Sequence, residues 1–255
     1  MDKRRVVAVT GKGGTGKTAL VAIMVKILTQ KNGLEVLVID ADSAVSLPQT
    51  LGIDAEKTVS DIREEVITDP EVKRRIAQTH ISKIIKTLIK HQNNTNLLVM
   101  GRPEAAGCFC TVNDLLKYGI ETIAKDYLIT VIDCEAGPEQ INRRVIENVD
   151  TLIIVTDTSA RGFKTANSIY QIAKSGAIKG SWEVGLVINR LDAKDSEKLT
   201  LQASDQMTIR ILGYIPDDKN ITDYDLTGKP LLELPDDSPS VMAVEEILGK
   251  MGLGS

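Results

Sequence analysis

The sequence of 255 residues predicts an α/β domain with a mainly parallel sheet flanked by helices. Short β-branched segments alternate along the chain with segments of helical periodicity, which is typical of right-handed strand–helix–strand crossovers. Apolar residues make up 42% and charged residues 26% of the chain, so it can bury a substantial core. No internal repeat, low-complexity tract or linker divides the sequence, and we expect residues 1–255 to form a single domain.

The first elements are a strand, a helix and a second strand, over Arg5–Thr10, Lys17–Lys31 and Val36–Asp40. Both strands are β-branched apolar runs typical of a buried parallel sheet, and the helix has its apolar residues on one stripe. Residues 54–96 form an unusually long and mostly helical segment before the next strand. Within it, Asp69 followed by Pro70 is typical of an N-cap and the first residue of a helix.

The rest of the chain continues the alternation of strands and helices. Further strands are expected over Leu97–Met100, Tyr127–Asp133, Thr151–Thr156, Val184–Asn189 and Ile209–Ile215. Helices are expected from a capping box at Thr111–Asp114, and over Pro138–Glu147, Gly162–Ala173 and Pro239–Lys250.

Composition argues against several classes of protein. Aromatic residues at 3% argue against a base-stacking surface for single-stranded nucleic acid, and a net charge of −4 argues against a general polyanion-binding surface. We therefore expect no nucleic-acid partner. Two histidines make a His-rich metal centre or a Ser-His-Asp triad unexpected, and three cysteines without a secretory segment do not form a disulfide framework.

The ends of the chain carry no pattern typical of membrane attachment. The start, MDKRRVVAVT, is basic, but the apolar stretch that follows is too short for a signal peptide. No segment approaches the roughly 20 apolar residues of a spanning helix. The C-terminal VEEILGKMGLGS carries two glutamates and one lysine, which makes it a poor anchor for anionic lipids. We expect a cytoplasmic protein with no stable membrane anchoring.

Residues 11–18, GKGGTGKT, match the phosphate-binding pattern G-x-x-x-x-G-K-[ST] between a predicted strand and a predicted helix. Inward-facing backbone amides and the helix N-terminus would surround phosphate oxygens. Lys17 should reach the β- and γ-phosphates, and Thr18 should contact Mg²⁺. The expected cofactors are thus ATP or ADP with Mg²⁺. The candidate nucleotide-binding residues of this loop are Gly11, Lys12, Gly13, Gly14, Thr15, Gly16, Lys17, Thr18 and Ala19.

Lys12 is a second lysine inside the loop, and with it the sequence resembles the deviant-Walker P-loop ATPases (the SIMIBI class), which include MinD, ParA and the nitrogenase iron protein. In that family the extra lysine reaches across a dimer to the partner's nucleotide. The resemblance implies a nucleotide-dependent homodimer in which Lys12 stabilises charge in trans, as an arginine finger does elsewhere. An ordinary solvated lysine is the simpler alternative.

Two aspartates at strand ends resemble the switch residues of the same family. Asp42 would orient the water that attacks the γ-phosphate, so it joins Lys12 and Lys17 as a catalytic candidate. After Asp42 the family often has Pro-Asn, whereas this chain has Ser-Ala. Asp133 is similar to a Walker B aspartate that holds Mg²⁺ directly or through water, with a helix N-cap as the alternative. Gly137 could offer its amide to the γ-phosphate.

The resemblance also assigns the nucleotide base to two later strand ends. Asn189, followed by Arg190, would bond the adenine edge, and Pro216 with Asp217 would flank the base. Asn and Pro are also common turn residues at such positions.

Cys108 and Cys110 are separated by one residue, and in a reducing compartment they would be thiols suited to a soft metal. Two thiolates make half of a four-ligand site, and a two-fold dimer would supply the other half on its axis. The alternative is a pair of buried, inert cysteines.

The string GRPE-x-x-GCFC, together with DCEAG at residues 133–137, is similar to the CooC-type accessory ATPases of carbon monoxide dehydrogenase. This resemblance spans essentially the whole chain. It implies that Cys108 and Cys110 bind Ni²⁺ for insertion into carbon monoxide dehydrogenase or a related acetyl-CoA synthase complex. Zn²⁺ could occupy the same thiolate site.

Two rival functions stay open from the sequence. One is a MinD- or ParA-like positioning ATPase whose ATP-bound dimer binds membrane or DNA. The other is an electron-transfer ATPase like the nitrogenase iron protein, in which Cys134 would join Cys108 or Cys110 in holding an iron–sulfur cluster.

Overall fold

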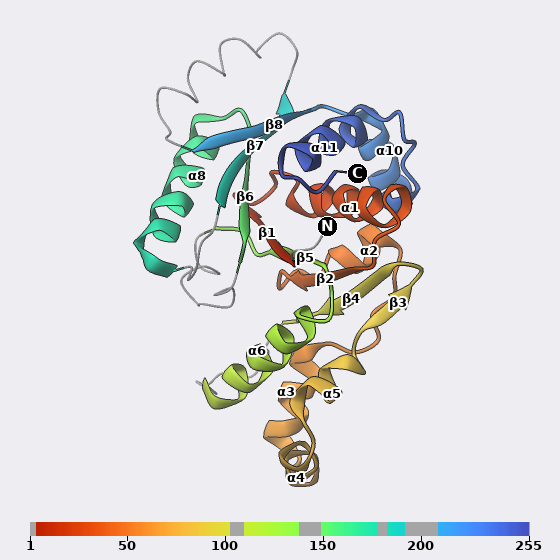
Figure 1. Cartoon of the computed structure of the whole chain (residues 1–255), viewed down its shortest axis with the longest axis vertical. Helices are drawn as coiled ribbons and strands as arrows, with labels where there is room; N and C mark the ends of the chain where they lie inside the picture. The colour runs from red at the N-terminus through yellow and green to blue at the C-terminus, as the bar shows by residue number, and fades with distance from the viewer. Residues whose placement is uncertain (1–3, 103–109, 138–148, 178–182, 192–208, 255) are drawn as a thin grey trace.

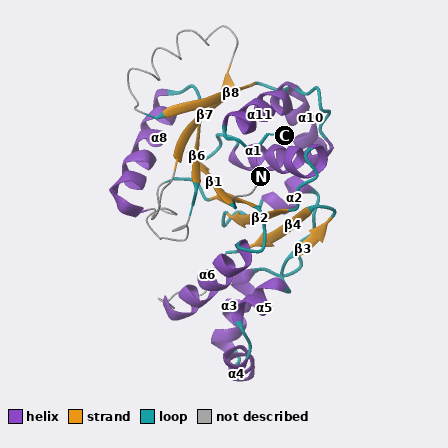
Figure 2. Ribbon diagram, viewed as in Figure 1, coloured by secondary structure: helices purple, strands orange, loops and turns teal. Residues whose placement is uncertain are grey.

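The computed structural model describes residues 4–102, 110–137, 149–177, 183–191 and 209–254. These residues form one eight-stranded sheet with the order β3-β4-β2-β5-β1-β6-β7-β8. Every neighbouring pair is parallel except β3 with β4. The predicted α/β fold with a mainly parallel sheet flanked by helices is therefore confirmed (Figures 1 and 2).

The strands are β1 (Arg5–Gly11), β2 (Val36–Ala41), β3 (Lys90–Gln92), β4 (Thr95–Val99), β5 (Ile129–Cys134), β6 (Thr151–Thr156), β7 (Glu183–Leu191) and β8 (Arg210–Pro216). The helices are α1 (Lys17–Lys26), α2 (Leu47–Leu51), α3 (Val59–Thr68), α4 (Pro70–Gln78), α5 (Ile81–Lys86), α6 (Cys110–Ala124), α8 (Ala160–Ile172), α10 (Lys219–Thr227) and α11 (Pro239–Lys250). In the part of the chain that is described, no helix has the length and apolar character needed to cross a membrane.

Helices cover both faces of the sheet, because successive strand residues point to opposite sides and both sides are apolar. On β1, Val7 and Val9 face α1 and α11, whereas Ala8 faces α8. On β2, Val36 and Val38 share the first face, whereas Leu37 and Ile39 pack with α3, α5 and α6. The sheet is therefore the centre of three apolar clusters.

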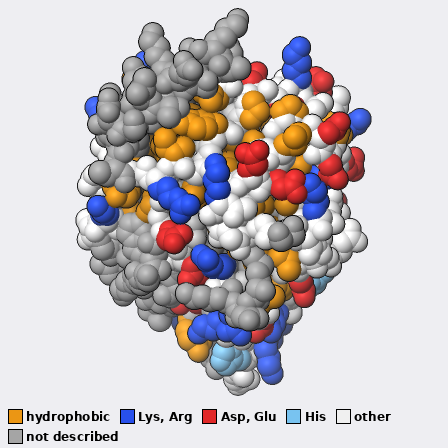
Figure 3. Space-filling model, turned by 45° about the horizontal axis from the view of Figure 1, so that its top comes forward, with side chains coloured by type: hydrophobic (Ala, Val, Ile, Leu, Met, Phe, Trp, Pro, Cys, Tyr) orange, Lys and Arg blue, Asp and Glu red, His pale blue; other side chains and the backbone are white. Residues whose placement is uncertain are grey.

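The helices α3, α4, α5 and α6, here called the helical lobe, project beyond the β4 end of the sheet (Figure 1). Gly119 of α6 lets this helix approach α5 closely, since a Cβ there would lie 2.6 Å from Cδ1 of Ile85. Asp69 caps α4 as predicted, accepting hydrogen bonds from the amides of Glu71 at 2.8 Å and Val72 at 3.4 Å. Figure 3 shows Lys and Arg side chains gathered at this end of the molecule.

Several predicted boundaries are wrong by a few residues. The first helix ends at Lys26 and continues as a π-helical turn over Ile27–Lys31. The strand expected at Leu97 begins at Thr95, and the one expected at Tyr127 begins at Ile129. The expected helix over residues 138–147 lies outside the described part of the chain.

The antiparallel edge strand β3 was not predicted, because its sequence Lys-His-Gln is polar and short. It joins β4 through a two-residue loop in which Asn93 has a φ of +51°. Asparagine tolerates this conformation better than other side chains, and such turns match the twist of a hairpin. The short helices α2 and α10 were missed as well, since neither has a strong apolar stripe.

The end of β1 is a point of close backbone approach. A Cβ built on Gly11 would lie 2.1 Å from the carbonyl oxygen of Val155 on β6. Because the obstructing atom belongs to the backbone of a central strand, neither side can move without breaking sheet hydrogen bonds. The glycine that opens the phosphate loop is thus required by the sheet itself.

We expect Gly11→Ala to lower the free energy of unfolding by about 3 kcal/mol or more, through overpacking and backbone strain. Gly33→Ala is a matched control, because Gly33 also has a positive φ, of +65°, but open space around it. The control should cost only about 1 kcal/mol. Urea denaturation of both variants tests this, and equal losses would contradict the steric explanation.

Candidate nucleotide-binding site

The predicted site residues meet at the carboxyl edge of the parallel sheet. The phosphate loop follows β1, Asp42 follows β2, Asp133 lies in β5, and Asn189 lies in β7. After β1 the chain continues to β2 on one side of the sheet, whereas after the adjacent strand β6 it continues to β7 on the other side, so the direction of the connections reverses between β1 and β6. Ligands of open α/β sheets bind at such a switch point.

The phosphate loop is held by its own hydrogen bonds and by β7. The Thr15 hydroxyl donates to the Lys12 carbonyl at 2.8 Å. The Asn189 side-chain amide donates to the Thr15 carbonyl at 2.8 Å. A Cβ on Gly16, where φ is +85°, would lie 2.4 Å from Nδ2 of Asn189, so only glycine leaves room for this bond. Lys17 begins α1 and is 6% exposed.

Asn189 therefore has a role that the sequence did not reveal, which is to brace the phosphate loop. Its side-chain oxygen also accepts from the amide of Arg190 at 2.9 Å. Arg190 has a φ of +56°, Pro216 ends the adjacent strand β8, and Asp217 is exposed beside it. These residues lie at the same edge as the loop, and their predicted contacts with adenine stay predictions.

Asp133 is fully buried, and neither carboxylate oxygen makes a hydrogen bond of ordinary geometry with the described residues. Burial raises the pKa of Asp133 to about 7, and the neighbouring Asp40 adds to this. The nearby Thr18 hydroxyl and Lys17 ammonium lower the pKa by less than burial raises it. An orphaned carboxylate beside Thr18 and the phosphate loop fits a Mg²⁺ ion, whose preferred ligands are oxygen atoms.

Asp40, which the sequence analysis did not single out as a functional residue, holds both ends of the first switch loop, residues 42–46 between β2 and α2. It is fully buried, and its two oxygens accept from the amides of Asp42 at 3.0 Å and Leu47 at 3.2 Å. Burial raises the pKa of Asp40 to about 6, although these hydrogen bonds oppose the rise. It lies in register with Asp133 on β5. The signal in the sequence was an aspartate inside an otherwise apolar strand.

Asp42 lies half-buried at the start of the first switch loop, and its carboxylate accepts from the amide of Ala44 at 2.9 Å. Next to it, the Ser43 hydroxyl donates to Glu135 at 2.8 Å, so the two switch segments are joined. Val45 has a φ of +51°, which is strained for a β-branched residue. Strain of this kind clusters where a loop must change conformation.

The second switch, which begins after β5 with residues 135–137, contacts the phosphate loop directly. The amide of Gly137 donates to the carbonyl of Gly11 at 2.9 Å. This amide was predicted to serve the γ-phosphate, so in this conformation it has a different partner.

Lys12 lies at the outer side of the loop and forms an ion pair with Asp157 at 3.0 Å. Both side chains are about one-third exposed, at 35% and 30%. Although burial acts to raise it, the pKa of Asp157 is lowered by hydrogen bonds from Ser159 and Lys12. Lys12 is therefore paired within its own protomer, and its predicted role in trans stays a prediction.

The structure describes only part of the predicted cysteine site. Cys108 lies outside the described residues, and Cys110 is the first residue of α6, with its side chain not described. Cys134 is 1% exposed, and burial raises the pKa of its thiol well above the usual range. A buried thiol of this kind is a poor metal ligand. Among the described residues, no three or more His, Cys, Asp or Glu side chains cluster as a metal site.

Residues 6–231 match the family CbiA, described as the CobQ/CobB/MinD/ParA nucleotide binding domain. The chain belongs to this family of P-loop ATPases. The family assignment agrees with the placement of the phosphate loop between β1 and α1.

Relatives within the family cover nearly the whole chain. An uncharacterized ATP-binding protein of Methanocaldococcus jannaschii, MJ0685, is 40% identical over 96% of this chain and 98% of its own length. The carbon monoxide dehydrogenase accessory protein CooC of Rhodospirillum rubrum is 30% identical over 89% of both chains.

Solved structures of family members share the fold. The MinC:MinD cell division protein complex of Aquifex aeolicus aligns with a TM-score of 0.74 and 20% identity, covering 98% of this chain and 96% of that one. MinD of Pyrococcus horikoshii, complexed with Mg-ADP, aligns with a TM-score of 0.69 and 19% identity, covering 97% and 96%.

The unpaired carboxylate of this ATPase predicts an unusual pH dependence of stability. Because the pKa of Asp133 is higher in the folded than in the unfolded state, the folded state keeps its proton longer, and stability falls as the pH rises from about 4 to about 7. Without nucleotide, Asp133→Asn should therefore be more stable than the wild type at pH 8, on the order of 2–3 kcal/mol, and equal to it near pH 4.

Urea denaturation at the two pH values measures this difference. The exposed Asp54→Asn is the matched control and should change little at either pH. A loss of stability in Asp133→Asn at pH 8 would show that the carboxylate has a stabilising partner in the absence of nucleotide. Added Mg²⁺ and an ATP analogue should stabilise the wild type more than the variant.

Proposed function

We propose that this ATPase acts as a nucleotide-dependent homodimer that hydrolyses Mg·ATP and uses the cycle to load Ni²⁺ into carbon monoxide dehydrogenase or a related acetyl-CoA synthase complex. The single observation that carries the Mg·ATP part is the buried, unpaired carboxylate of Asp133 beside Lys17 and Thr18. A charge in that position is costly unless a cation joins it.

The phosphate loop residues have distinct tasks in this proposal. Loop amides and Lys17 bind the phosphates, while Thr18 and Asp133 hold Mg²⁺, directly or through water. When bound, Mg²⁺ neutralises charge on the β- and γ-phosphate oxygens. Asn189 keeps the loop in shape through the Thr15 carbonyl.

The switch residues carry out hydrolysis in this proposal. Asp42 accepts a hydrogen bond from the attacking water and so aligns it with the γ-phosphate. Asp40 positions Asp42 by holding its amide. The Gly137 amide would have to leave the Gly11 carbonyl to reach the γ-phosphate, which couples the second switch to nucleotide.

Lys12 acts in the partner's site in this proposal. Its ion pair with Asp157 is only partly buried, so the lysine can exchange this partner for a phosphate at small cost. The exchange would make dimer formation depend on ATP.

The nickel part rests on Cys108 and Cys110, which precede and begin α6, and on the 30% identity with CooC of Rhodospirillum rubrum. One pair of thiolates from each protomer would make a four-thiolate site on the dimer axis. The burial of Cys134 supports a site made by the Cys108–Cys110 pair alone rather than an iron–sulfur cluster that includes Cys134. Dimer opening after hydrolysis would divide the site and release the ion.

Lys12→Ala should lower ATP hydrolysis at least about 100-fold, because it removes a charge that acts on the transition state. It should also abolish the ATP-dependent dimer in light scattering coupled to size-exclusion chromatography. Lys31→Ala is the matched control, since Lys31 forms only a surface ion pair with Glu245. A Lys12→Ala protein that still hydrolyses ATP as a monomer at the wild-type rate would contradict the trans role.

The double variant Cys108→Ser, Cys110→Ser should lose nickel binding, which we expect at one ion per wild-type dimer with an ATP analogue. Elemental analysis by mass spectrometry after gel filtration measures the ratio, and Cys134→Ala is the control that should keep it. Nucleotide affinity in the same samples reports an intact fold. Unchanged nickel content in the double variant, or visible iron–sulfur absorption in the wild type, would contradict the proposed metal site.

A further inference from the structure

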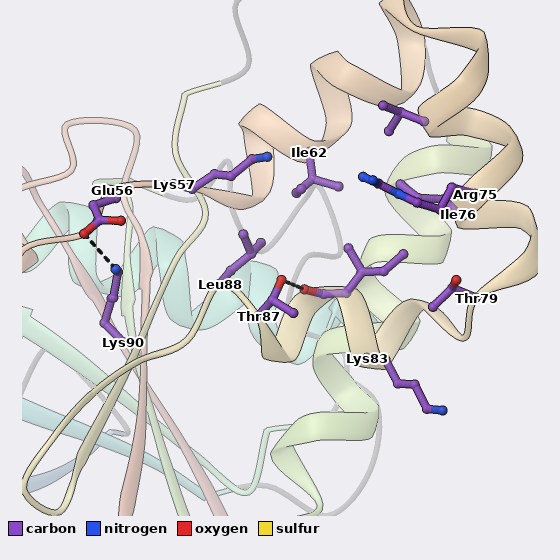
Figure 4. Close-up of a pocket in the computed structure, with 12 residues that line it drawn as sticks. Glu56, Lys57, Ile62, Arg75, Ile76, Thr79, Lys83, Thr87, Leu88 and Lys90 are labelled. Atoms are coloured by element: carbon purple, nitrogen blue, oxygen red, sulfur yellow. Dashed lines mark hydrogen bonds and ion pairs between the residues drawn. The ribbon is translucent and has the colours of Figure 1, made fainter.

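A cavity of about 510 Å³ lies in the helical lobe, away from the phosphate loop (Figure 4). It is formed by the segment before α3, by α3, α4 and α5, and by the residues that lead into β3. Its volume is in the range of sites that bind small organic molecules. None of its lining residues belongs to the candidate nucleotide-binding site.

The floor of the cavity is apolar. Aliphatic side chains from three helices and the following turn line it: Ile62, Val72, Ile76, Ile84 and Leu88. Ile62, Ile76 and Leu88 are almost fully buried, so the floor is continuous with the apolar cluster beneath the sheet. Such a surface accepts a hydrocarbon group and excludes water.

The rim of the cavity is cationic. Four basic residues contribute to its lining: Lys57, Arg75, Lys83 and Lys90. Lys57 pairs with Glu65 at 2.6 Å, and Lys90 pairs with Glu56 at 3.2 Å. Arg75 and Lys83 have no ion pair within the part of the chain that is described. In Figure 4, Lys57 and Arg75 reach toward Ile62 from opposite sides, whereas Lys83 extends away from it.

The local charge differs in sign from that of the whole protein. Among the residues that line the cavity, four are basic and one, Glu56, is acidic, whereas the chain as a whole has a net charge of −4. Basic side chains therefore outnumber acidic ones in the lining of the cavity. A local positive potential of this kind attracts anions.

We propose that the cavity binds an amphipathic organic anion, with a carboxylate or phosphate head on Arg75 and an apolar body over Ile62, Ile84 and Leu88. A planar guanidinium matches both head groups with paired hydrogen bonds. Of the four basic residues, Arg75 both lacks an ion pair in the described part of the chain and points toward Ile62 on the apolar floor of the cavity (Figure 4). Neither a bare anion nor a neutral apolar molecule uses both halves of the cavity. The inference does not rest on the proposed nickel function.

Isothermal titration of the full chain with decanoate and with decyl phosphate, below their micelle concentrations, tests the site. Saturating Mg·ADP blocks the phosphate loop, which binds anions by itself. We expect one-to-one binding of at least one probe, with decanol and acetate each at least about tenfold weaker. Decanol tests the head group and acetate tests the apolar floor.

Arg75→Gln should weaken binding of that probe about tenfold or more, since a hydrogen bond to a charged group is lost. Arg75→Lys should restore part of it. Arg74→Gln removes the same charge from the neighbouring exposed position, outside the lining, and should have little effect. No binding of either probe, equal binding of decanol, or equal losses in Arg74→Gln and Arg75→Gln would overturn the proposal.

Discussion

The buried carboxylates of Asp40 and Asp133 lie side by side on β2 and β5, and much of the site depends on this pair. Two like charges inside a sheet are unfavourable, and burial accordingly raises the pKa of both groups. Asp40 is compensated by two backbone amides. Asp133 has no such partner among the described residues, so its charged form is costly unless a cation binds beside it.

From this pair a set of contacts leads to both switch segments and to the phosphate loop. Asp40 fixes the first switch loop through Leu47, and that loop reaches the second switch through the bond between Ser43 and Glu135. The second switch in turn bonds the phosphate loop between Gly137 and Gly11. These three bonds connect the phosphate loop with both switch segments.

The helical lobe is joined to the sheet by apolar packing and by a hydrogen bond from the Ser60 amide to the Met100 carbonyl at 2.9 Å. Helix α5 lies between two features of the lobe. Ile84 on one side lines the cavity, whereas Ile81 and Ile85 on the other side contact α6 at Gly119. Helix α6 begins at Cys110, so the predicted metal-binding segment leads into the same lobe.

The sequence by itself determined the order of the parallel strands along the chain, the phosphate loop and the family, because these depend on periodicity and on short motifs with local geometry. It also placed Asp42 and Asp133 correctly at strand ends. Only the tertiary structure decided which residues at the ends of different strands contact one another. Asn189 braces a loop 174 residues away, and Lys12 pairs with Asp157 at a separation of 145 residues. The polar edge strand β3 and the cavity in the helical lobe also depend on the tertiary structure, because both arise from contacts between segments that no local pattern records.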